Sequence, residues 1–344
     1  MSRIMLLSRI FPEGIPTLWC PVITPFSAPG VCDMERMHRH LEEIAPDVKG
    51  ILIPGSTGEG WDMSDHDILQ VMEGVLPKAK ELEQHLLIGA LKGDAEKTLA
   101  SIDSSLQWLK ELSRVKHDQE ALDAWGIAGF TVCPPTGADL SQETIREELE
   151  KILQRDVPIA LYQLPQVTKN SMSPETVEYL IHKYQNIIMF KDTSGTDETA
   201  QSIHDPDDVF FVRGAEGNYS SWQKLGGGPY DGFLLSTANS FSRELGMIME
   251  YLEEGKQDEA DDLSRRITAC VEAVFPLAAS FKAGNAFANA NKAFDHIRAW
   301  GADAELLRGP MLYGGARLEA ELTAAARKVM EEQGFDVNRG YMEE

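Results

Sequence analysis

The sequence is poor in cysteine. Its 344 residues include four, Cys20, Cys32, Cys133 and Cys270, and no two of them form a C-x-x-C pair. A secreted domain held together by disulfides would have more cysteines at a denser spacing. We therefore expect buried or unreactive thiols and a cytoplasmic protein.

Positive charge is also scarce, because 32 lysines and arginines face 55 acidic residues and leave a net charge of -23. A surface this negative repels the phosphate backbone of nucleic acids and anionic lipid headgroups, and no local basic cluster compensates. We expect small molecules as partners, and neither nucleic acid nor membrane.

Long hydrophobic runs are missing as well. The N-terminal stretch MSRIMLLSRIFPEG is partly apolar, but Arg9 interrupts it before it reaches the length of a signal peptide core or a membrane span. Residues 1–14 are predicted to form an N-terminal arm without a targeting role.

Short apolar runs are present in a regular series. Hydrophobic residues make up 43% of the chain, which excludes general disorder, and apolar runs rich in β-branched residues alternate with longer amphipathic segments. The candidate strands are residues 17–24, 50–54, 85–90, 129–133, 159–163, 187–191, 210–213 and 232–236.

Helix-start signals lie between these runs. Asp33, Ser64, Ser141 and Ser173 each precede an amphipathic segment, as N-cap residues do. Apolar strands separated by helices indicate a parallel sheet with both faces covered, and eight such units are the number that closes a barrel.

The predicted fold is therefore of the α/β class, a (β/α)₈ TIM barrel over residues 15–241, with an open doubly wound sheet as the alternative. Beyond it the strand signals stop and alanine-rich helical patterns follow, so residues 242–344 are predicted to form a C-terminal helical extension. The polar stretch DVNRGYMEE is expected to be a frayed tail.

Lys191 is the first candidate for chemistry. It directly follows the apolar run IIMF, and reactive groups of TIM barrels lie at the carboxyl ends of the strands. A lysine there loses hydration of its ammonium, which favours the neutral amine that can form a Schiff base with a ketone. The alternative is a lysine whose ammonium extends to solvent.

Tyr162 lies near the end of the strand IALYQ, where its phenol could pass a proton to and from a substrate. It could equally be a core ring.

In ILIPGSTGEG, Gly55 and Gly58 allow close approach of the backbone, and Ser56 and Thr57 add hydroxyl donors that could hold a carboxylate. Glu59 is expected to brace this turn.

Taken in order, GSTGE, YQLP, KDTSG and GGGPYDGFLLSTAN resemble the dihydrodipicolinate synthase / N-acetylneuraminate lyase family, from about residue 15 to the C-terminal helices. The resemblance implies a barrel with a helical C-terminal region and a homo-oligomer, dimer or tetramer. It also implies a lysine Schiff base with pyruvate or another 2-oxo acid, with no metal or other cofactor.

The resemblance also implies roles for single residues. Lys191 becomes the Schiff-base lysine and Tyr162 the proton-relay tyrosine. Carboxylate binding falls to Gly55, Ser56 and Thr57, and the backbone near Leu234 lines the pocket.

The chain departs from the synthases of this family at three places. TVCPPTGAD has no tyrosine after the fourth strand, Val167 stands where those synthases have an arginine, and Gln163 replaces an asparagine. Lys169 could supply a positive charge at a different offset.

We therefore predict a lyase that acts on pyruvate or a 2-keto-3-deoxy sugar acid by aldol chemistry or dehydration. The alternatives are 4-hydroxy-tetrahydrodipicolinate synthase itself and a non-catalytic 2-oxo acid-binding barrel.

Three further features remain open. Glu216 in RGAEGN is a possible acid or base, or a residue that complements a helix start. The motif DTSGT, beginning at Asp192, fits a phosphorylated aspartate as well. The histidines, His38 and His40 among them, lack metal-ligand spacing and are expected at the surface.

Overall fold

The computed structural model describes residues 1–343. Within them, eight parallel strands close into a barrel in the order β1-β10-β9-β8-β7-β6-β5-β4. The strands are β1 (Leu18–Pro21), β4 (Gly50–Ile53), β5 (His85–Gly89), β6 (Ile127–Val132), β7 (Ile159–Gln163), β8 (Ile187–Asp192), β9 (Phe210–Arg213) and β10 (Gly232–Leu234). This TIM barrel confirms the eight predicted strands, and the open-sheet alternative is wrong.

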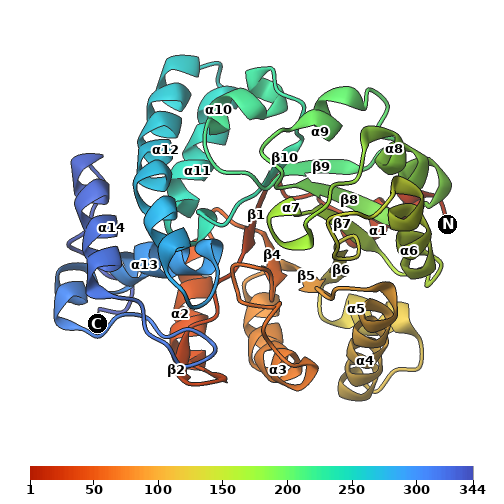
Figure 1. Ribbon diagram of the computed structural model, residues 1–344, viewed down its shortest axis with the longest axis horizontal. Helices are drawn as coiled ribbons and strands as arrows, with labels where there is room; N and C mark the ends of the chain where they lie inside the picture. Colours follow the sequence, from red (N-terminus) through yellow and green to blue (C-terminus); the bar gives the residue numbers. More distant parts are fainter. Residues whose placement is uncertain (344) are drawn as a thin grey trace. The chain divides into compact units, whose positions relative to one another are not determined.

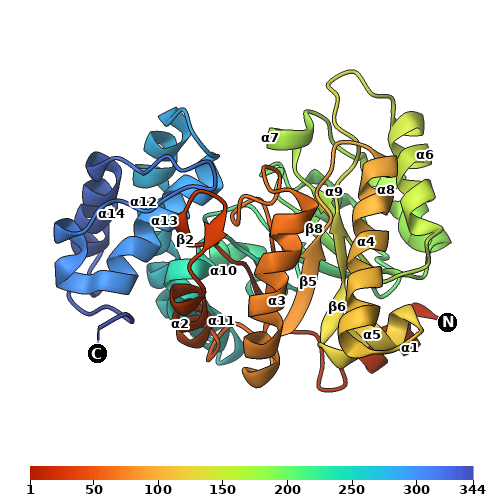
Figure 2. The same cartoon turned by 90° about the horizontal axis from the view of Figure 1, so that it is seen from below.

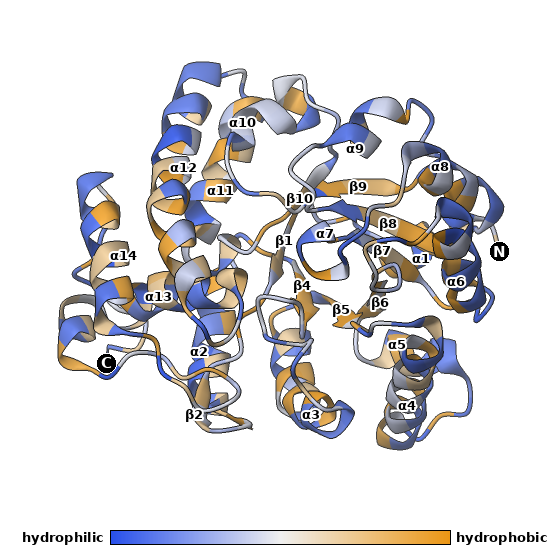
Figure 3. Cartoon of the chain, in the orientation of Figure 1, coloured by the Kyte–Doolittle hydropathy of each residue, from blue (hydrophilic) through white to orange (hydrophobic). Residues whose placement is uncertain are grey.

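The barrel strands are buried, apart from the first residues of β5 and β9. Every residue of β6, β7 and β8 is buried, and the hydropathy colouring marks β8 and β9 as largely apolar (Figure 3). Strands covered on both faces bury consecutive residues rather than alternate ones, which explains why the sequence shows continuous apolar runs.

All four predicted helix starts are confirmed. Each of the four side chains accepts a hydrogen bond from the backbone N–H three residues later. Asp33 begins α2 (Met34–Ile44), Ser64 begins α3 (Asp65–Glu81), Ser141 begins α6 (Gln142–Leu153) and Ser173 begins α8 (Pro174–Lys183).

The chain forms two compact units. The first comprises residues 1–19, 85–215 and 222–234, and the second comprises residues 20–84, 216–221 and 235–344. In the first unit, α4 (Ala95–Ser113) and α5 (Asp118–Ala124) lie beside β5 and β6 (Figure 2). They are separate helices because Arg114 takes a left-handed conformation, with φ at 56°, directly after α4.

The N-terminal arm contains a docked helix, α1 (Arg3–Ile10). Arg3 is 1% exposed, and its guanidinium donates to the carbonyls of Ile187 (2.7 Å) and Tyr184 (2.9 Å) and pairs with Asp207. Shorter elements of the same unit are α7 (Pro165–Thr168) and α9 (Glu198–Ser202).

In the second unit, long helices form the predicted C-terminal helical region (Figure 1). They are α11 (Ala238–Glu253), α12 (Gln257–Ser280), α13 (Ala286–Trp300) and α14 (Ala320–Glu332), and α12 packs against the other three. A small hairpin of β2 (Phe26–Ala28) and β3 (Val31–Cys32), which the sequence analysis did not predict, precedes α2. Among the described residues, no helix has both the length and the apolar character needed to span a bilayer.

Two sequence expectations about this unit are wrong. The tail is not frayed over residues 336–343, because Val337 is 1% exposed and the Tyr341 hydroxyl donates to Asp295 Oδ1 at 2.7 Å. Its last residue, Glu344, lies outside the described residues. His40 is not at the surface either: it is fully buried, with Nδ1 3.1 Å from Asp295 Oδ1 and Nε2 3.0 Å from Asn239 Oδ1. The Asp295 carboxylate gives the Tyr341 hydroxyl and the buried His40 imidazole a polar partner inside the unit.

Candidate active site

Lys191 and Tyr162 lie side by side in the first unit. They are register partners on the adjacent parallel strands β8 and β7, so their side chains point to the same face. Lys191 is 3% exposed and its Nζ lies 4.1 Å from the centroid of the Tyr162 ring. A lysine whose ammonium reaches solvent is therefore the wrong interpretation, and the structure brings these two predicted residues together.

The surroundings of Lys191 include residues that the sequence analysis did not single out. Cys133, directly after β6, is 3% exposed; burial raises the pKa of its thiol, and the nearby Lys191 ammonium opposes that rise. Gly214 lies under the lysine side chain: a Cβ at this position would be 2.6 Å from Lys191 Cε and would also collide with Thr193 Oγ1. Only glycine leaves room for this arrangement.

The loop after Lys191 is held by a buried ionic network. Asp192 is fully buried and accepts a hydrogen bond from the Ser194 N–H at 2.8 Å, and burial raises the pKa of its carboxyl group. Arg213 binds both carboxylate oxygens of Asp197 at 2.8 and 3.0 Å, and the Tyr230 hydroxyl donates to Asp197 at 2.7 Å. An aspartate without solvent access argues against the phospho-aspartate interpretation of DTSGT.

The GSTGE loop belongs to the second unit and follows β4. Ser56 is 4% and Thr57 2% exposed, and the Gly60 N–H donates to the Gly55 carbonyl at 2.9 Å, which closes the turn. Glu59 is 1% exposed and forms an ion pair with Lys292, so its predicted bracing role is confirmed.

The residues at the departures from the synthase pattern make local contacts. Gln163 donates to Thr199 Oγ1 at 3.3 Å and accepts from the Met172 N–H at 2.7 Å, so its amide holds neighbouring loops. The exposed Lys169 donates to the Gln166 carbonyl at 2.8 Å, within its own loop.

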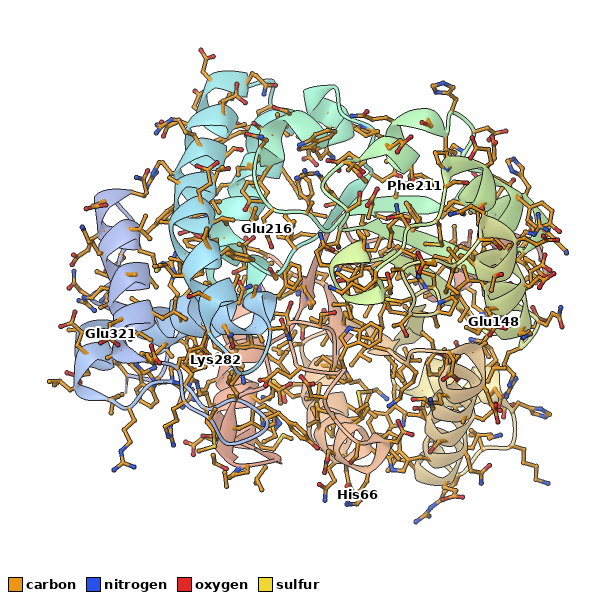
Figure 4. The ribbon with its side chains drawn as sticks, in the orientation of Figure 1. His66, Glu148, Phe211, Glu216, Lys282 and Glu321 are labelled. Atoms are coloured by element: carbon orange, nitrogen blue, oxygen red, sulfur yellow. The ribbon has the colours of Figure 1, made fainter. Side chains whose placement is uncertain are left out.

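Glu216 lies in the second unit, in the loop before α10 (Tyr219–Trp222) (Figure 4). Its carboxylate accepts four hydrogen bonds, from the Tyr219 hydroxyl (3.0 Å), the Ser236 hydroxyl (2.6 Å), and the N–H (3.1 Å) and hydroxyl (2.6 Å) of Thr237. These contacts tie the loop to the residues before α11. Leu234, the last residue of β10, is fully buried and pairs with Trp19 of β1.

Within residues 1–343, no group of three or more histidine, cysteine, aspartate or glutamate side chains is arranged to hold a metal ion. The four cysteines are free thiols, three of them buried and Cys32 partly so.

Comparisons with known proteins identify the family and the fold. A family model described as the dihydrodipicolinate synthetase family matches residues 113–312. The chain is 24% identical over 256 residues to a 4-hydroxy-tetrahydrodipicolinate synthase of Methanococcus aeolicus, which covers 74% of this chain and 81% of that protein. It is 23% identical over 257 residues to the enzyme of the same name from Lactococcus lactis, covering 74% and 80%.

Solved structures share the fold at low sequence identity. A dihydrodipicolinate synthase from Cyanidioschyzon merolae with lysine bound has a TM-score of 0.72 at 19% identity, with 92% of this chain and 97% of that chain covered. A prophage protein of the same family from E. coli K12, in complex with pyruvate, has a TM-score of 0.71 at 17% identity and covers 93% and 98%. The structure of KD(P)GA from T. tenax has a TM-score of 0.70 at 18% identity, covering 92% and 98%.

Proposed function

Because the chain belongs to the dihydrodipicolinate synthetase family, whose members are class I aldolases and lyases, we propose that Lys191 forms a Schiff base with a 2-oxo acid. The observation that carries the proposal is the burial of the Lys191 amine, with its Nζ 4.1 Å from the centroid of the Tyr162 ring. Partial dehydration of an ammonium favours its neutral, nucleophilic form.

In the proposed reaction, the neutral Lys191 amine attacks the ketone carbon and forms a carbinolamine. Loss of water then gives an iminium, which acts as an electron acceptor for the carbon next to it. That carbon can lose its bond to the following carbon of the substrate, or it can lose a proton, and in both cases the iminium accepts the electron pair. The first course is aldol cleavage. The second leads to dehydration once hydroxide leaves the next carbon. Tyr162 is the proposed group that carries protons to and from the carbinolamine oxygen.

Carboxylate binding is proposed for the loop after β4. Glycine turns leave backbone N–H groups open to an anion, and the hydroxyls of Ser56 and Thr57 add donors. The family resemblance supports this role for Gly55, Ser56 and Thr57, and it supports pocket lining by the backbone near Leu234.

The substrate proposed is pyruvate or a 2-keto-3-deoxy sugar acid. A homo-oligomer is proposed because the family resemblance implies one, and a cytoplasmic location because the sequence is poor in cysteine. The second candidate is 4-hydroxy-tetrahydrodipicolinate synthase, because the curated relatives described above carry that name. The missing tyrosine in TVCPPTGAD and the uncharged Val167 favour the first candidate.

The test is reductive trapping followed by a substrate panel. Sodium borohydride with pyruvate is expected to add the mass of a reduced pyruvyl group to the peptide that contains Lys191. Incubation with 2-keto-3-deoxy acids, or with pyruvate and aldehydes, then shows whether pyruvate is released or consumed. Reversible binding of pyruvate without a mass change would favour the non-catalytic alternative. Condensation of pyruvate with aspartate semialdehyde would favour the synthase.

A further inference from the structure

A second buried lysine contacts the GSTGE loop. Lys292, on α13, is 2% exposed and pairs with Glu59, while the same ammonium donates to the Met311 carbonyl at 2.9 Å. Its Nζ also lies 4.5 Å from the centroid of the Phe26 ring. All of these residues belong to the second unit.

Other residues of the C-terminal region hold the same loop. The Tyr313 N–H donates to the second carboxylate oxygen of Glu59 at 2.8 Å, and the Asn285 side chain donates to the Ser56 carbonyl at 3.0 Å. Within the loop region, Trp61 Nε1 donates to the Ser56 hydroxyl at 2.9 Å. The loop conformation thus depends on contacts from residues more than 200 positions away in the sequence.

The charges of the pair depend on each other. Burial lowers the pKa of the Lys292 ammonium, and the adjacent Glu59 carboxylate opposes this effect. Without Lys292, the buried Glu59 carboxylate would lack its counter-charge, and it lies two residues from Thr57. An unpaired carboxylate there would repel any anion that the loop binds.

We propose that Lys292 is a positioning residue for binding of the 2-oxo acid carboxylate: it neutralises Glu59 and fixes the GSTGE loop. This inference rests on the proposed function, in which Ser56 and Thr57 of that loop hold the carboxylate. Lys292 itself touches no reacting atom in this scheme.

The test compares Lys292→Met with the double variant Lys292→Met/Glu59→Gln. The matched control is Lys282→Met, which removes one exposed lysine next to the same helices without touching Glu59 (Figure 4). The pyruvate concentration that gives half-maximal trapping of Lys191 should rise about 10-fold or more in Lys292→Met, a loss of about 1.4 kcal/mol of binding. The maximal trapping rate should change much less.

The double variant should recover most of this loss, because it contains neither charge, and the control should match the unaltered protein. Should Lys292→Met not fold, Lys292→Gln takes its place, since it keeps a hydrogen-bond donor but no charge. An unchanged half-maximal concentration, or a folded double variant as impaired as the single one, would overturn the proposal.

Hydrogen exchange of the peptide over residues 55–61 separates this inference from the proposed function, because it needs no substrate. Exchange should be faster in Lys292→Met than in Lys282→Met. If pyruvate is not trapped by the unaltered protein, the proposed function fails, whereas the exchange result still shows whether Lys292 fixes the loop. If trapping occurs but neither exchange nor half-maximal concentration changes, Lys292 is not a positioning residue.

Discussion

Lys191 and Lys292 are both buried, and each ammonium lies over an aromatic ring. Lys292 also contacts the Glu59 carboxylate, which opposes the fall in its pKa that burial causes. Lys191 lies near the buried Cys133 thiol. In the proposed mechanism, Lys191 is the amine that attacks a ketone and Lys292 is the partner of a carboxylate.

Tyr162→Phe tests the proton relay. The ring remains to pack against Lys191, but the hydroxyl is lost, so turnover should fall by about 10²- to 10⁴-fold while the fold is retained. Adding borohydride to reactions with pyruvate at successive times measures the rate of imine formation. Turnover at the unaltered rate would show that Tyr162 only packs in the core.

Gly214→Ala tests whether the position of the Lys191 side chain matters. The added Cβ would be 2.6 Å from Lys191 Cε, so the side chain must shift, and trapping should slow by about 10-fold or more. Gly314→Ala is the control, because a Cβ there meets no atom within 4 Å and the backbone needs no positive φ. Equal trapping in both variants would mean that the lysine accommodates the methyl group at no cost to reactivity.

At the scale of single elements, α1 is fastened to the first unit by Arg3. Arg3→Met removes the guanidinium hydrogen bonds to the carbonyls of Ile187 and Tyr184 and breaks the pair with Asp207. Denaturation with urea should show a loss of about 3 kcal/mol in the free energy of unfolding. Arg9→Met, at an exposed position on the same helix, should change stability little, and an equal loss in both would contradict this role for Arg3.

The elements that could be predicted from sequence are those with local signals. The apolar run before Lys191 predicts β8, and Ser173 followed by Pro174 predicts the start of α8. The strands of the β2–β3 hairpin are too short to show the alternation of apolar and polar residues that marks a strand. The burial of His40 and the docking of Tyr341 depend on Asp295, a partner distant in sequence, so no local pattern could reveal them.

The same limit applies to the candidate site. Lys191 and Tyr162 could be found because strand ends in a TIM barrel are where reactive groups gather. Gly214 lacks such a signal, since its importance lies in its approach to Lys191. Lys292 lies in a helix segment that contains no motif, and only its contact with Glu59 distinguishes it from other lysines. The structure brings Lys191 and Tyr162 together, but the chemical roles of the site residues stay predictions; these residues are Lys191, Tyr162, Gly55, Ser56, Thr57, Leu234 and Glu216.

For the molecule as a whole, the Asp295 network predicts sensitivity to acid. Burial alone would raise the pKa of the Asp295 carboxyl, but Arg36, His40 and the Tyr341 hydrogen bond hold that pKa well below its ordinary value. A depressed carboxyl pKa contributes stability that is present above the unfolded value of about 3.9 and is lost as the pH falls below it.

Asp295→Asn should therefore destabilise the protein by about 3 kcal/mol at pH 7 and by less near pH 3, where the unaltered protein has begun to lose this contribution. Urea unfolding at the two pH values measures the difference. Asp303→Asn, at an exposed position, is the control. A destabilisation that is the same at both pH values would show that the charge of Asp295 is not what stabilises the network.

The identity of the residue that bonds to pyruvate tests the central claim most directly. After reduction with borohydride, digestion and mass spectrometry should locate the pyruvyl group on Lys191 alone, and Lys191→Ala should remain folded without adding mass. Modification of another lysine, such as Lys292, or an unmodified Lys191 at saturating pyruvate would contradict the Schiff-base mechanism.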